Sequence, residues 1–180
     1  MRLHLIRHPK PSIEPGICYG QLDILAKIET AELACLRAEL PPGLPVWSSP
    51  LQRSRQLAEQ LHLQPIIDAR LAEMSFGDWE GRPWDDIPRH ELDAWAADVA
   101  GYAPPGGESP RALQLRALDF VASLTVPEAV IVTHAGVIRT LLAHWLELDD
   151  SEWLSVSPDY LSVTTVERDA NGRVLSVTNR

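Results

Sequence analysis

The chain has 180 residues and a mass of 20.0 kDa, with 45% apolar and 23% charged residues. This length and composition predict a single globular domain over residues 1–180 and exclude disordered, collagen-like and coiled-coil chains. The net charge of −9 disfavours nucleic acid as a partner, because an acidic protein repels a polyanion.

The cysteines and the apolar runs bear on the compartment. Cys18 and Cys35 are too few for a disulfide framework or a zinc cluster. No apolar run approaches the length of a membrane span. We therefore expect a cytoplasmic protein with no membrane partner and no metal site. The sequence carries no signal of an oligomeric state.

Short apolar runs alternate with segments of helical spacing along the chain. Strands are expected at residues 3–6, 45–48, 65–68, 129–133, 161–166 and 173–177. Helices are expected at residues 25–40, 50–61, 110–124 and 137–148. This alternation predicts an α/β fold, a three-layer sandwich with a mainly parallel central sheet flanked by helices. Residues 169–172, Asp-Ala-Asn-Gly, predict a hairpin between the last two strands.

Two helix starts carry a serine followed by a proline. Ser49-Pro50 and Ser109-Pro110 place serine at the N-cap position and proline at the first helical position. A serine hydroxyl accepts a backbone N–H that the helix leaves unpaired, and proline has no N–H to leave unpaired. Both pairs therefore predict the beginning of a helix.

Residues 74–108 interrupt the alternation of strands and helices. They hold Trp79, Trp84 and Trp95, several prolines and many acidic residues, with only weak strand signal. We predict that this segment is a small, mostly helical insertion in the domain.

Basic side chains follow the predicted strands at the sheet edge where ligands collect in open α/β folds. Arg7 and His8 follow the first strand, and His134 follows the fourth. Arg53 lies in the first turn of the helix after the second strand. Guanidinium groups suit phosphate oxygens, and a histidine among arginines is pushed toward its neutral, nucleophilic form. The set indicates phosphoryl transfer through a phosphohistidine on a small phosphorylated metabolite.

Five segments, in order along residues 3 to about 145, resemble the histidine phosphatase superfamily, also called phosphoglycerate-mutase-like. These segments are Leu5-Ile6-Arg7-His8, Ser48-Ser49-Pro50-Leu51-x-Arg53-x-Arg55, Leu71-x-Glu73-x-x-x-Gly77-x-Trp79-Glu80-Gly81, Gly106-Gly107-Glu108-Ser109 and Val132-Thr133-His134-Ala135-Gly136-Val137-Ile138-Arg139. The order and spacing of the five together carry the resemblance, since any one alone is common.

The resemblance implies a role for each matched residue. It makes His8 the phosphate-accepting nucleophile and Glu73 the proton donor to the leaving oxygen and then the base for water. Arg7, Arg53 and His134 complete the phosphate pocket. The family needs no metal or other cofactor, so the resemblance implies a metal-independent phosphomonoesterase.

The chain departs from the family pattern directly after the catalytic histidine. The family usually has glycine and then Glu-Thr there, whereas this chain reads Pro9-Lys10-Pro11. Proline removes one backbone donor that could meet the phosphate, and Lys10 adds a cation that could replace it. We expect activity to be kept and the substrate range to be affected.

The segment from Gly16 to Asp23, with its Cys-Tyr-Gly-x-x-Asp run, is similar to the α-ribazole phosphatase branch of cobalamin biosynthesis. This similarity implies hydrolysis of α-ribazole 5′-phosphate. A broad-specificity sugar-phosphate or nucleotide phosphatase, a phosphoprotein phosphatase and a non-catalytic phosphate-binding regulatory module stay open as alternatives.

A second group of residues is predicted to contact the substrate or to orient the arginines. The candidates for substrate contact are Tyr19, Gly20, Gln21, Glu108 and Trp84. Glu108 is a candidate because its carboxylate could orient the arginines. Ordinary loop packing is the alternative explanation for Tyr19, Gln21 and Trp84, and a simple helix entry is the alternative for the segment that holds Glu108.

Overall fold

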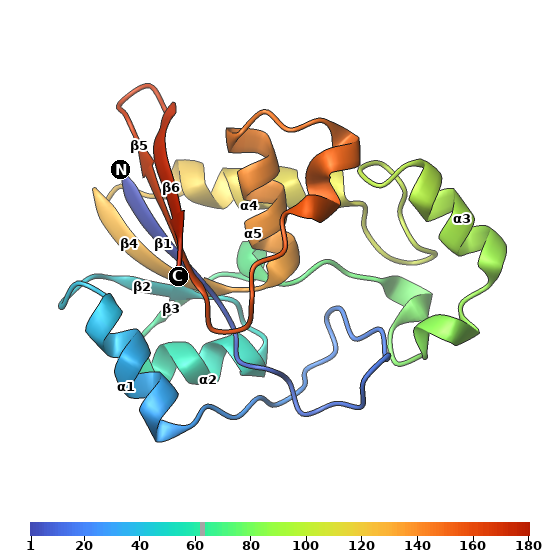
Figure 1. Ribbon diagram of the computed structural model, residues 1–180, viewed down its shortest axis with the longest axis horizontal. Helices are drawn as coiled ribbons and strands as arrows, with labels where there is room; N and C mark the ends of the chain where they lie inside the picture. The colour runs from blue at the N-terminus through green and yellow to red at the C-terminus, as the bar shows by residue number, and fades with distance from the viewer. Residues whose placement is uncertain (62–63) are drawn as a thin grey trace.

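Figure 1 shows the computed structural model, which describes residues 1–61 and 64–180. Six strands form one mixed sheet in the order β3-β2-β4-β1-β5-β6. The strands are β1 (Arg2–Arg7), β2 (Val46–Ser48), β3 (Ile66–Ile67), β4 (Glu128–Thr133), β5 (Val163–Arg168) and β6 (Val174–Asn179). Strands β1 to β4 are parallel, and β5 and β6 add an antiparallel hairpin at one edge. The predicted α/β class with a mainly parallel sheet is confirmed.

Helices cover both faces of this sheet (Figure 1). The α-helices of the sandwich are α1 (Thr30–Glu39), α2 (Gln52–Leu61), α4 (Pro110–Ser123) and α5 (Ala135–Trp145). α1 and α2 pack on one face, and α4 and α5 on the other. Among the described residues, none of the helices is both long enough and apolar enough to cross a membrane.

The central position of β4 in the sheet explains why its sequence is a nearly continuous apolar run. Ala129 and Ile131 belong to the core beneath α4 and α5, whereas Val130 and Val132 belong to the core beneath α1 and α2. Successive side chains of a strand point to opposite faces, so a strand covered on both faces is apolar at every position. β4 therefore lies at the centre of the sandwich, between β1 and β2.

Several helix boundaries differ from the predicted ones for local reasons. α1 begins later than predicted, where Glu29 and Glu32 form a capping box. α2 begins after a turn in which Ser49 Oγ accepts the N–H of Leu51 at 3.2 Å. α5 ends earlier than predicted, because Glu147 takes a left-handed φ of 54° that a helix does not continue. Ser109 caps α4 as predicted.

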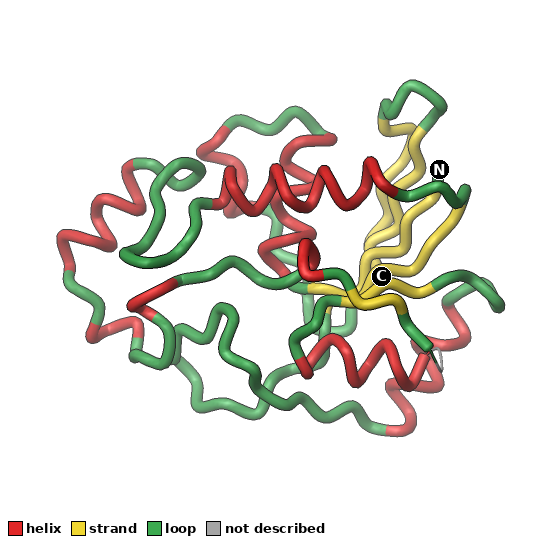
Figure 2. The backbone as a smooth tube through the Cα atoms, turned by 180° about the vertical axis from the view of Figure 1, so that it is seen from behind, coloured by secondary structure: helices red, strands yellow, loops and turns green. Residues whose placement is uncertain are grey.

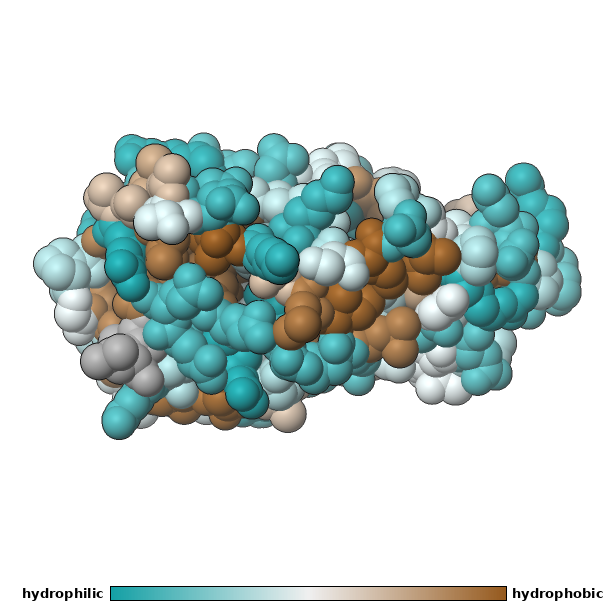
Figure 3. Space-filling model, turned by 90° about the horizontal axis from the view of Figure 1, so that it is seen from below, coloured by the Kyte–Doolittle hydropathy of each residue, from teal (hydrophilic) through white to brown (hydrophobic). Residues whose placement is uncertain are grey.

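Residues 74–108 leave the sandwich and carry α3 (Arg89–Ala97) away from the sheet (Figures 1 and 2). Besides α3 this segment has two short 3-10 turns, η2 (Gly77–Trp79) and η3 (Trp84–Asp86), joined by loops, so it is less helical than predicted. Apolar surface gathers between the sandwich and the end formed by α3 (Figure 3).

The segment has its own aromatic core. Trp79 is fully buried at its centre, and the rings of Phe76, Trp84, Trp95 and Tyr102 lie with centroids 6.0 to 6.5 Å from its own. Trp79 Nε1 donates to Glu91 Oε2 of α3 at 2.5 Å. Large aromatic side chains bury much apolar area for few residues, which suits a segment with little regular structure.

The register of the parallel strands brings distant residues to one edge. Arg7 pairs with Thr133 across β1 and β4, and Ser48 pairs with Val132 across β2 and β4. The residues that follow therefore emerge together at the carboxyl edge. There His8 N–H donates to the Thr133 carbonyl at 3.0 Å, which joins the two strand ends that carry histidines.

Candidate active site

His8 is a buried histidine held in one tautomer, with 1% of its surface exposed. Its Nδ1 lies 2.6 Å from the Pro9 carbonyl oxygen, which can only accept, so Nδ1 carries the proton. The Nε2 lone pair accepts from Nε of Arg53 at 3.3 Å. Burial and the positive charge of Arg53 lower the pKa of His8 to about 3, so the ring is neutral near pH 7. A neutral imidazole with its Nε2 lone pair beside a guanidinium is a nucleophile prepared for an anionic partner.

Arg53 is fully buried and fixed by backbone oxygens. Its terminal nitrogens donate to the carbonyls of Leu22 at 2.7 Å and Gly20 at 2.5 Å. Burial lowers the pKa of this guanidinium, but arginine stays charged in proteins. Gly20 is required here, because a Cβ on it would lie 2.3 Å from Oε1 of Glu80. The predicted substrate-contact residue Gly20 thus holds the phosphate-pocket arginine.

His134 lies beside His8, with ring centroids 5.0 Å apart. Its Nε2 is 2.7 Å from Ser49 Oγ, which already accepts the N–H of Leu51 and so has its own proton to donate. This assignment leaves the proton of His134 on Nδ1, which is buried and has no partner in the part of the chain described. Burial, then the neighbouring His8 and Arg53, keep the pKa of His134 well below its usual value. An unpaired N–H next to the nucleophile suits a phosphate oxygen.

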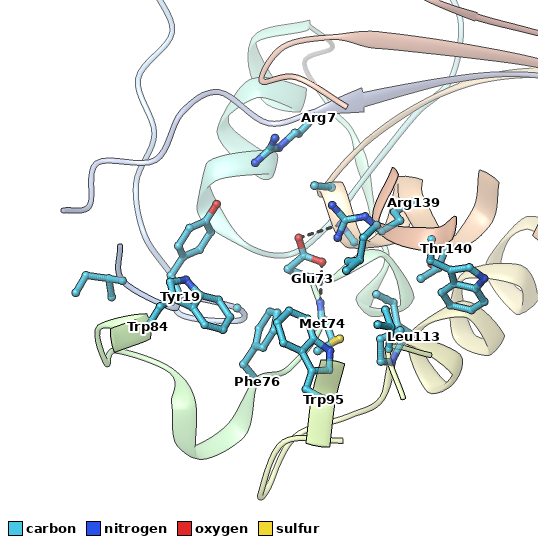
Figure 4. A pocket seen from close by; sticks show the side chains of 18 residues that line it. Arg7, Tyr19, Glu73, Met74, Phe76, Trp84, Trp95, Leu113, Arg139 and Thr140 are labelled. Atoms are coloured by element: carbon cyan, nitrogen blue, oxygen red, sulfur yellow. Dashed lines mark hydrogen bonds between the residues drawn. The ribbon is translucent and has the colours of Figure 1, made fainter. Parts of the chain in front are cut away.

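Glu73 and Arg7 line the same cavity (Figure 4). The Glu73 carboxylate accepts the N–H of Met74 at 2.9 Å and the N–H of Gly136, at the start of α5, at 3.2 Å. Arg7, at the end of β1, donates to the Pro158 carbonyl at 2.8 Å. The cavity therefore has a cation and a carboxylate at its polar end.

Gln21 and Glu108 lie behind Glu73 rather than along the cavity. Gln21 Nε2 donates to the Glu73 carbonyl at 2.8 Å. Glu108 accepts the N–H of Ser75 at 3.0 Å and pairs with Arg116 at 2.6 Å. Arg116 in turn donates to the carbonyls of residues 70, 72 and 73. These side chains brace the backbone that carries Glu73.

Three of the predicted contact residues, Tyr19, Gly20 and Trp84, line the cavity. Apolar side chains that were not predicted as substrate contacts form most of the remaining wall. They are Ile17, Met74, Phe76, Trp95, Val99, Leu113, Trp153 and Leu154. Arg139 also lines the cavity beside Glu73 (Figure 4). Its place at the end of a matched motif, three residues after Gly136, was the available signal, because helical spacing places it on the same side of α5 as Gly136.

The residues Pro9-Lys10-Pro11 leave the nucleophile intact. Pro9 keeps the carbonyl that orients His8 and lacks only the N–H of the usual glycine. Lys10 is exposed and does not line the cavity. Within residues 1–61 and 64–180, no group of three or more His, Cys, Asp or Glu side chains is arranged to hold a metal ion.

An α/β sandwich that presents two neutral histidines and two arginines at the carboxyl edge of its sheet defines an enzyme of phosphoryl groups. The histidine phosphatase superfamily (branch 1) model matches residues 3–180, and the chain belongs to that superfamily. It is a phosphoric monoester hydrolase, as the phosphatase names of its relatives also indicate.

Three relatives show the range of the similarity. The chain is 32% identical to the glucosyl-3-phosphoglycerate phosphatase of Mycobacterium tuberculosis (strain ATCC 25618 / H37Rv), over 84% of this chain and 78% of the relative. It is 31% identical to the adenosylcobalamin/alpha-ribazole phosphatase of Escherichia coli (strain K12), over 79% and 78%. A crystal structure of phosphoglycerate mutase from Thermus thermophilus superposes with a TM-score of 0.77 at 32% identity, covering 98% of both chains.

Gly136→Ala tests whether the carboxylate of Glu73 needs its place at the start of α5. A Cβ on residue 136 would lie 2.1 Å from Glu73 Oε1, so the carboxylate must move. Alanine favours a helix over glycine by up to about 1 kcal/mol, so the thermal midpoint should stay or rise. We expect kcat to fall about tenfold or more. The same change in a Glu73→Gln background should add no further loss; a full additional loss there would contradict the explanation.

The lowered pKa of His8, from 6.5 to about 3, makes folding stability depend on pH. Below about pH 6.5 the unfolded chain binds a proton that the folded His8 does not bind, so stability falls as the pH drops toward 3. The slope is up to roughly 1.4 kcal/mol per pH unit for one histidine. The free energy of unfolding, measured with urea at each pH across this range, should depend less steeply on pH for His8→Asn than for the wild type. His90→Asn, at an exposed position of α3, is the control, and equal slopes for all three proteins would refute the effect.

Proposed function

We propose that this enzyme hydrolyses α-ribazole 5′-phosphate through a phosphohistidine on His8. The observation that carries the proposal is a cavity with charged side chains at one end, including Arg7 directly before His8, and an aromatic wall. The residues Arg7, Glu73 and Arg139 lie at one end, and Phe76, Trp84, Trp95 and Trp153 are part of the apolar lining. α-Ribazole 5′-phosphate has the same division, a charged phosphate joined through ribose to a flat, apolar base.

In the first step Nε2 of His8 attacks phosphorus in line with the leaving oxygen. The new P–N bond forms as the P–O bond to ribose breaks, and Glu73 gives its proton to the departing ribose oxygen. Arg7, Arg53 and Nδ1–H of His134 stabilise the charge on the three equatorial oxygens, where most catalysis of phosphoryl transfer arises. Arg53 is suited to this role because its contacts with the Gly20 and Leu22 carbonyls hold it in place before substrate binds.

In the second step water attacks the phosphohistidine. Glu73, now a carboxylate, takes a proton from the water as the new P–O bond forms. The P–N bond breaks, its electron pair returns to Nε2, and inorganic phosphate leaves. His8 ends neutral, as it began, because its surroundings disfavour the protonated ring.

The aromatic wall favours a substrate with a flat base over a bare sugar phosphate. Trp84 and Trp95 stack with centroids 6.0 Å apart and an angle of 13° between ring planes, and Phe76 meets Trp84 edge-on at 5.6 Å. Stacking a base on aromatic side chains contributes about 1–3 kcal/mol. A glucosyl-phosphoglycerate carries many hydroxyls instead, and these need polar partners that this wall does not offer.

Arg139 favours a rival substrate class, an ester that carries a second anionic group. A guanidinium in the cavity suits a carboxylate such as that of a phosphoglycerate. Its Nε, however, donates to the Val156 carbonyl at 2.8 Å, and its charge faces Glu73. The broad-specificity alternative is therefore decided by a substrate panel.

In this proposal the enzyme acts in the cytoplasm, which agrees with the free thiols of Cys18 and Cys35.

Glu73→Gln tests the proton donor. A glutamine cannot protonate the leaving oxygen, so we expect kcat for an alkyl phosphate to fall about 100-fold or more. Hydrolysis of 4-nitrophenyl phosphate, whose leaving group needs no proton, should fall far less. Asp78→Asn changes an exposed carboxylate of the same segment and should leave both rates within about twofold. Equal losses for the two esters would remove Glu73 from the acid role.

The substrate is tested by kcat/KM for α-ribazole 5′-phosphate against ribose 5-phosphate, its matched control without the base. Adenosine 5′-phosphate, 3-phosphoglycerate and glucosyl-3-phosphoglycerate complete the panel. We expect a preference of about 100-fold or more over ribose 5-phosphate, which corresponds to about 3 kcal/mol. Trp84→Leu should reduce this ratio.

Each other outcome of the panel identifies a rival. Similar rates on all esters would make the chain a broad-specificity phosphatase, and a preference for the phosphoglycerates would move the specificity to Arg139. No phosphate release, together with no labelling of His8 by a phosphate donor, would indicate the non-catalytic phosphate-binding module.

A further inference from the structure

Tyr160 contacts the phosphate site from a part of the chain that no motif covers. It lies between η4 (Asp150–Ser155) and β5, and its side chain is 37% exposed. The guanidinium carbon of Arg7 lies 3.7 Å from the centroid of its ring. The ring of His8 lies 5.7 Å from the same ring. One tyrosine therefore packs against both the nucleophile and an arginine of the phosphate pocket.

Arg7 has no carboxylate partner among the described residues. No ion pair involves it, and its Nε is buried without a hydrogen-bond partner. Its anchors are the Pro158 carbonyl, 2.8 Å from one terminal nitrogen, and the face of Tyr160. A carboxylate would fix the arginine but would also neutralise it. An aromatic face holds the flat guanidinium through its π electrons and leaves the N–H edges and the charge for an anion.

The backbone around Tyr160 is fixed to the strand end that carries Arg7. Leu161 N–H donates to the Arg7 carbonyl at 3.1 Å, and Arg7 N–H donates to the Ser162 carbonyl at 3.3 Å. Leu161 takes a left-handed φ of 62°, which a residue with a branched side chain rarely adopts. Such a conformation persists when its surroundings hold it, and here it turns the chain at Tyr160.

The hydroxyl of Tyr160 makes a separate contact, 3.3 Å from the hydroxyl of Tyr19. Tyr19 in turn lies beneath the other pocket arginine, with the Arg53 guanidinium carbon 5.1 Å from its ring centroid. The ring of Tyr160 and its hydroxyl thus have different partners, so variants can separate the two contributions.

We propose that Tyr160 is a positioning residue, whose ring face holds the guanidinium of Arg7 in place to bind the phosphoryl group. This inference rests on the proposed function, because it assigns Arg7 to the equatorial phosphate oxygens. It extends that function to a residue that touches neither the base nor the reacting atoms.

Tyr160→Leu and Tyr160→Phe test the role of the ring. Leucine removes the aromatic face, and we expect kcat/KM for 4-nitrophenyl phosphate to fall roughly tenfold, within the range for loss of a partly desolvated cation–π contact. The inhibition constant of vanadate should rise by a similar factor, because vanadate needs the same arginine. Phenylalanine keeps the face and loses only the hydroxyl, so it should stay within about threefold of the wild type. If the Phe variant were as impaired as the Leu variant, the hydroxyl contact with Tyr19 rather than the ring face would account for the loss, and the proposal would be overturned.

A double-mutant cycle with Arg7→Met separates positioning from general structural damage. In the Arg7→Met background, adding Tyr160→Leu should lower kcat/KM by less than about twofold relative to Arg7→Met alone. Both variants are measured at high enzyme concentration. A repeated tenfold loss in that background would show that Tyr160 acts independently of Arg7. Tyr160→Gln replaces the leucine variant if calorimetry shows that the latter is unfolded. Failure of the proposed function can be told apart from failure of the Tyr160 proposal, since the wild type itself would then release no phosphate and His8 would not be labelled.

Discussion

The contact between the Arg53 guanidinium and Nε2 of His8 is the interaction on which the rest of the site depends. Burial, together with a permanent cation at 3.3 Å, keeps the ring neutral and leaves Nε2 without a proton. The cost is a fully buried guanidinium, which the protein offsets with the carbonyls of Gly20 and Leu22. Those carbonyls belong to a loop that Asp23 fastens to the first residue of α2, where Asp23 Oδ1 accepts the N–H of Gln52 at 2.7 Å. The loop after β1 is therefore part of the phosphate pocket and not a passive connection.

The site holds Arg7 and Arg53 with backbone carbonyls and an aromatic face rather than with carboxylates. Arg53 is held by carbonyls, Arg7 by a carbonyl and an aromatic face, and Arg139 by a carbonyl with Glu73 nearby. A carbonyl contributes a dipole but no charge, so the positive potential stays directed at the space where a phosphoryl group binds. An overall charge of −9 is compatible with this arrangement, because a local field at close range outweighs distant, screened surface charges.

The sequence predicted the residues whose role follows from local position and left out those that depend on packing. His8, Arg53 and His134 follow strands or begin helices, and the parallel register then brings them together. Tyr160 follows an irregular segment, and its contact with Arg7 spans more than 150 residues, so no periodicity signals it. Gln21 and Glu108 were predicted to contact the substrate or to orient the arginines, whereas their side chains hydrogen-bond to the backbone around Glu73. The insertion was predicted as mostly helical because its strand signal is weak, whereas much of it is loop folded around Trp79.

The two ends of the cavity come from different parts of the architecture. The polar end is lined by Arg7 at the end of β1, by Glu73 and by Arg139 of α5, whereas His8, Arg53 and His134 lie outside the lining. The aromatic end is built largely on residues 74–108, whose core around Trp79 is separate from the cores of the sandwich. A change in the aromatic segment can therefore alter which organic group fits while the strand register that sets the histidines stays the same. Glu73 lies at the junction, since Arg116 and Gln21 fix its backbone while Met74 and Gly136 fix its carboxylate. In the proposed mechanism Glu73 is the proton donor, and it is held by both parts, so a leaving group bound against the aromatic segment would meet the phosphoryl chemistry of the sandwich.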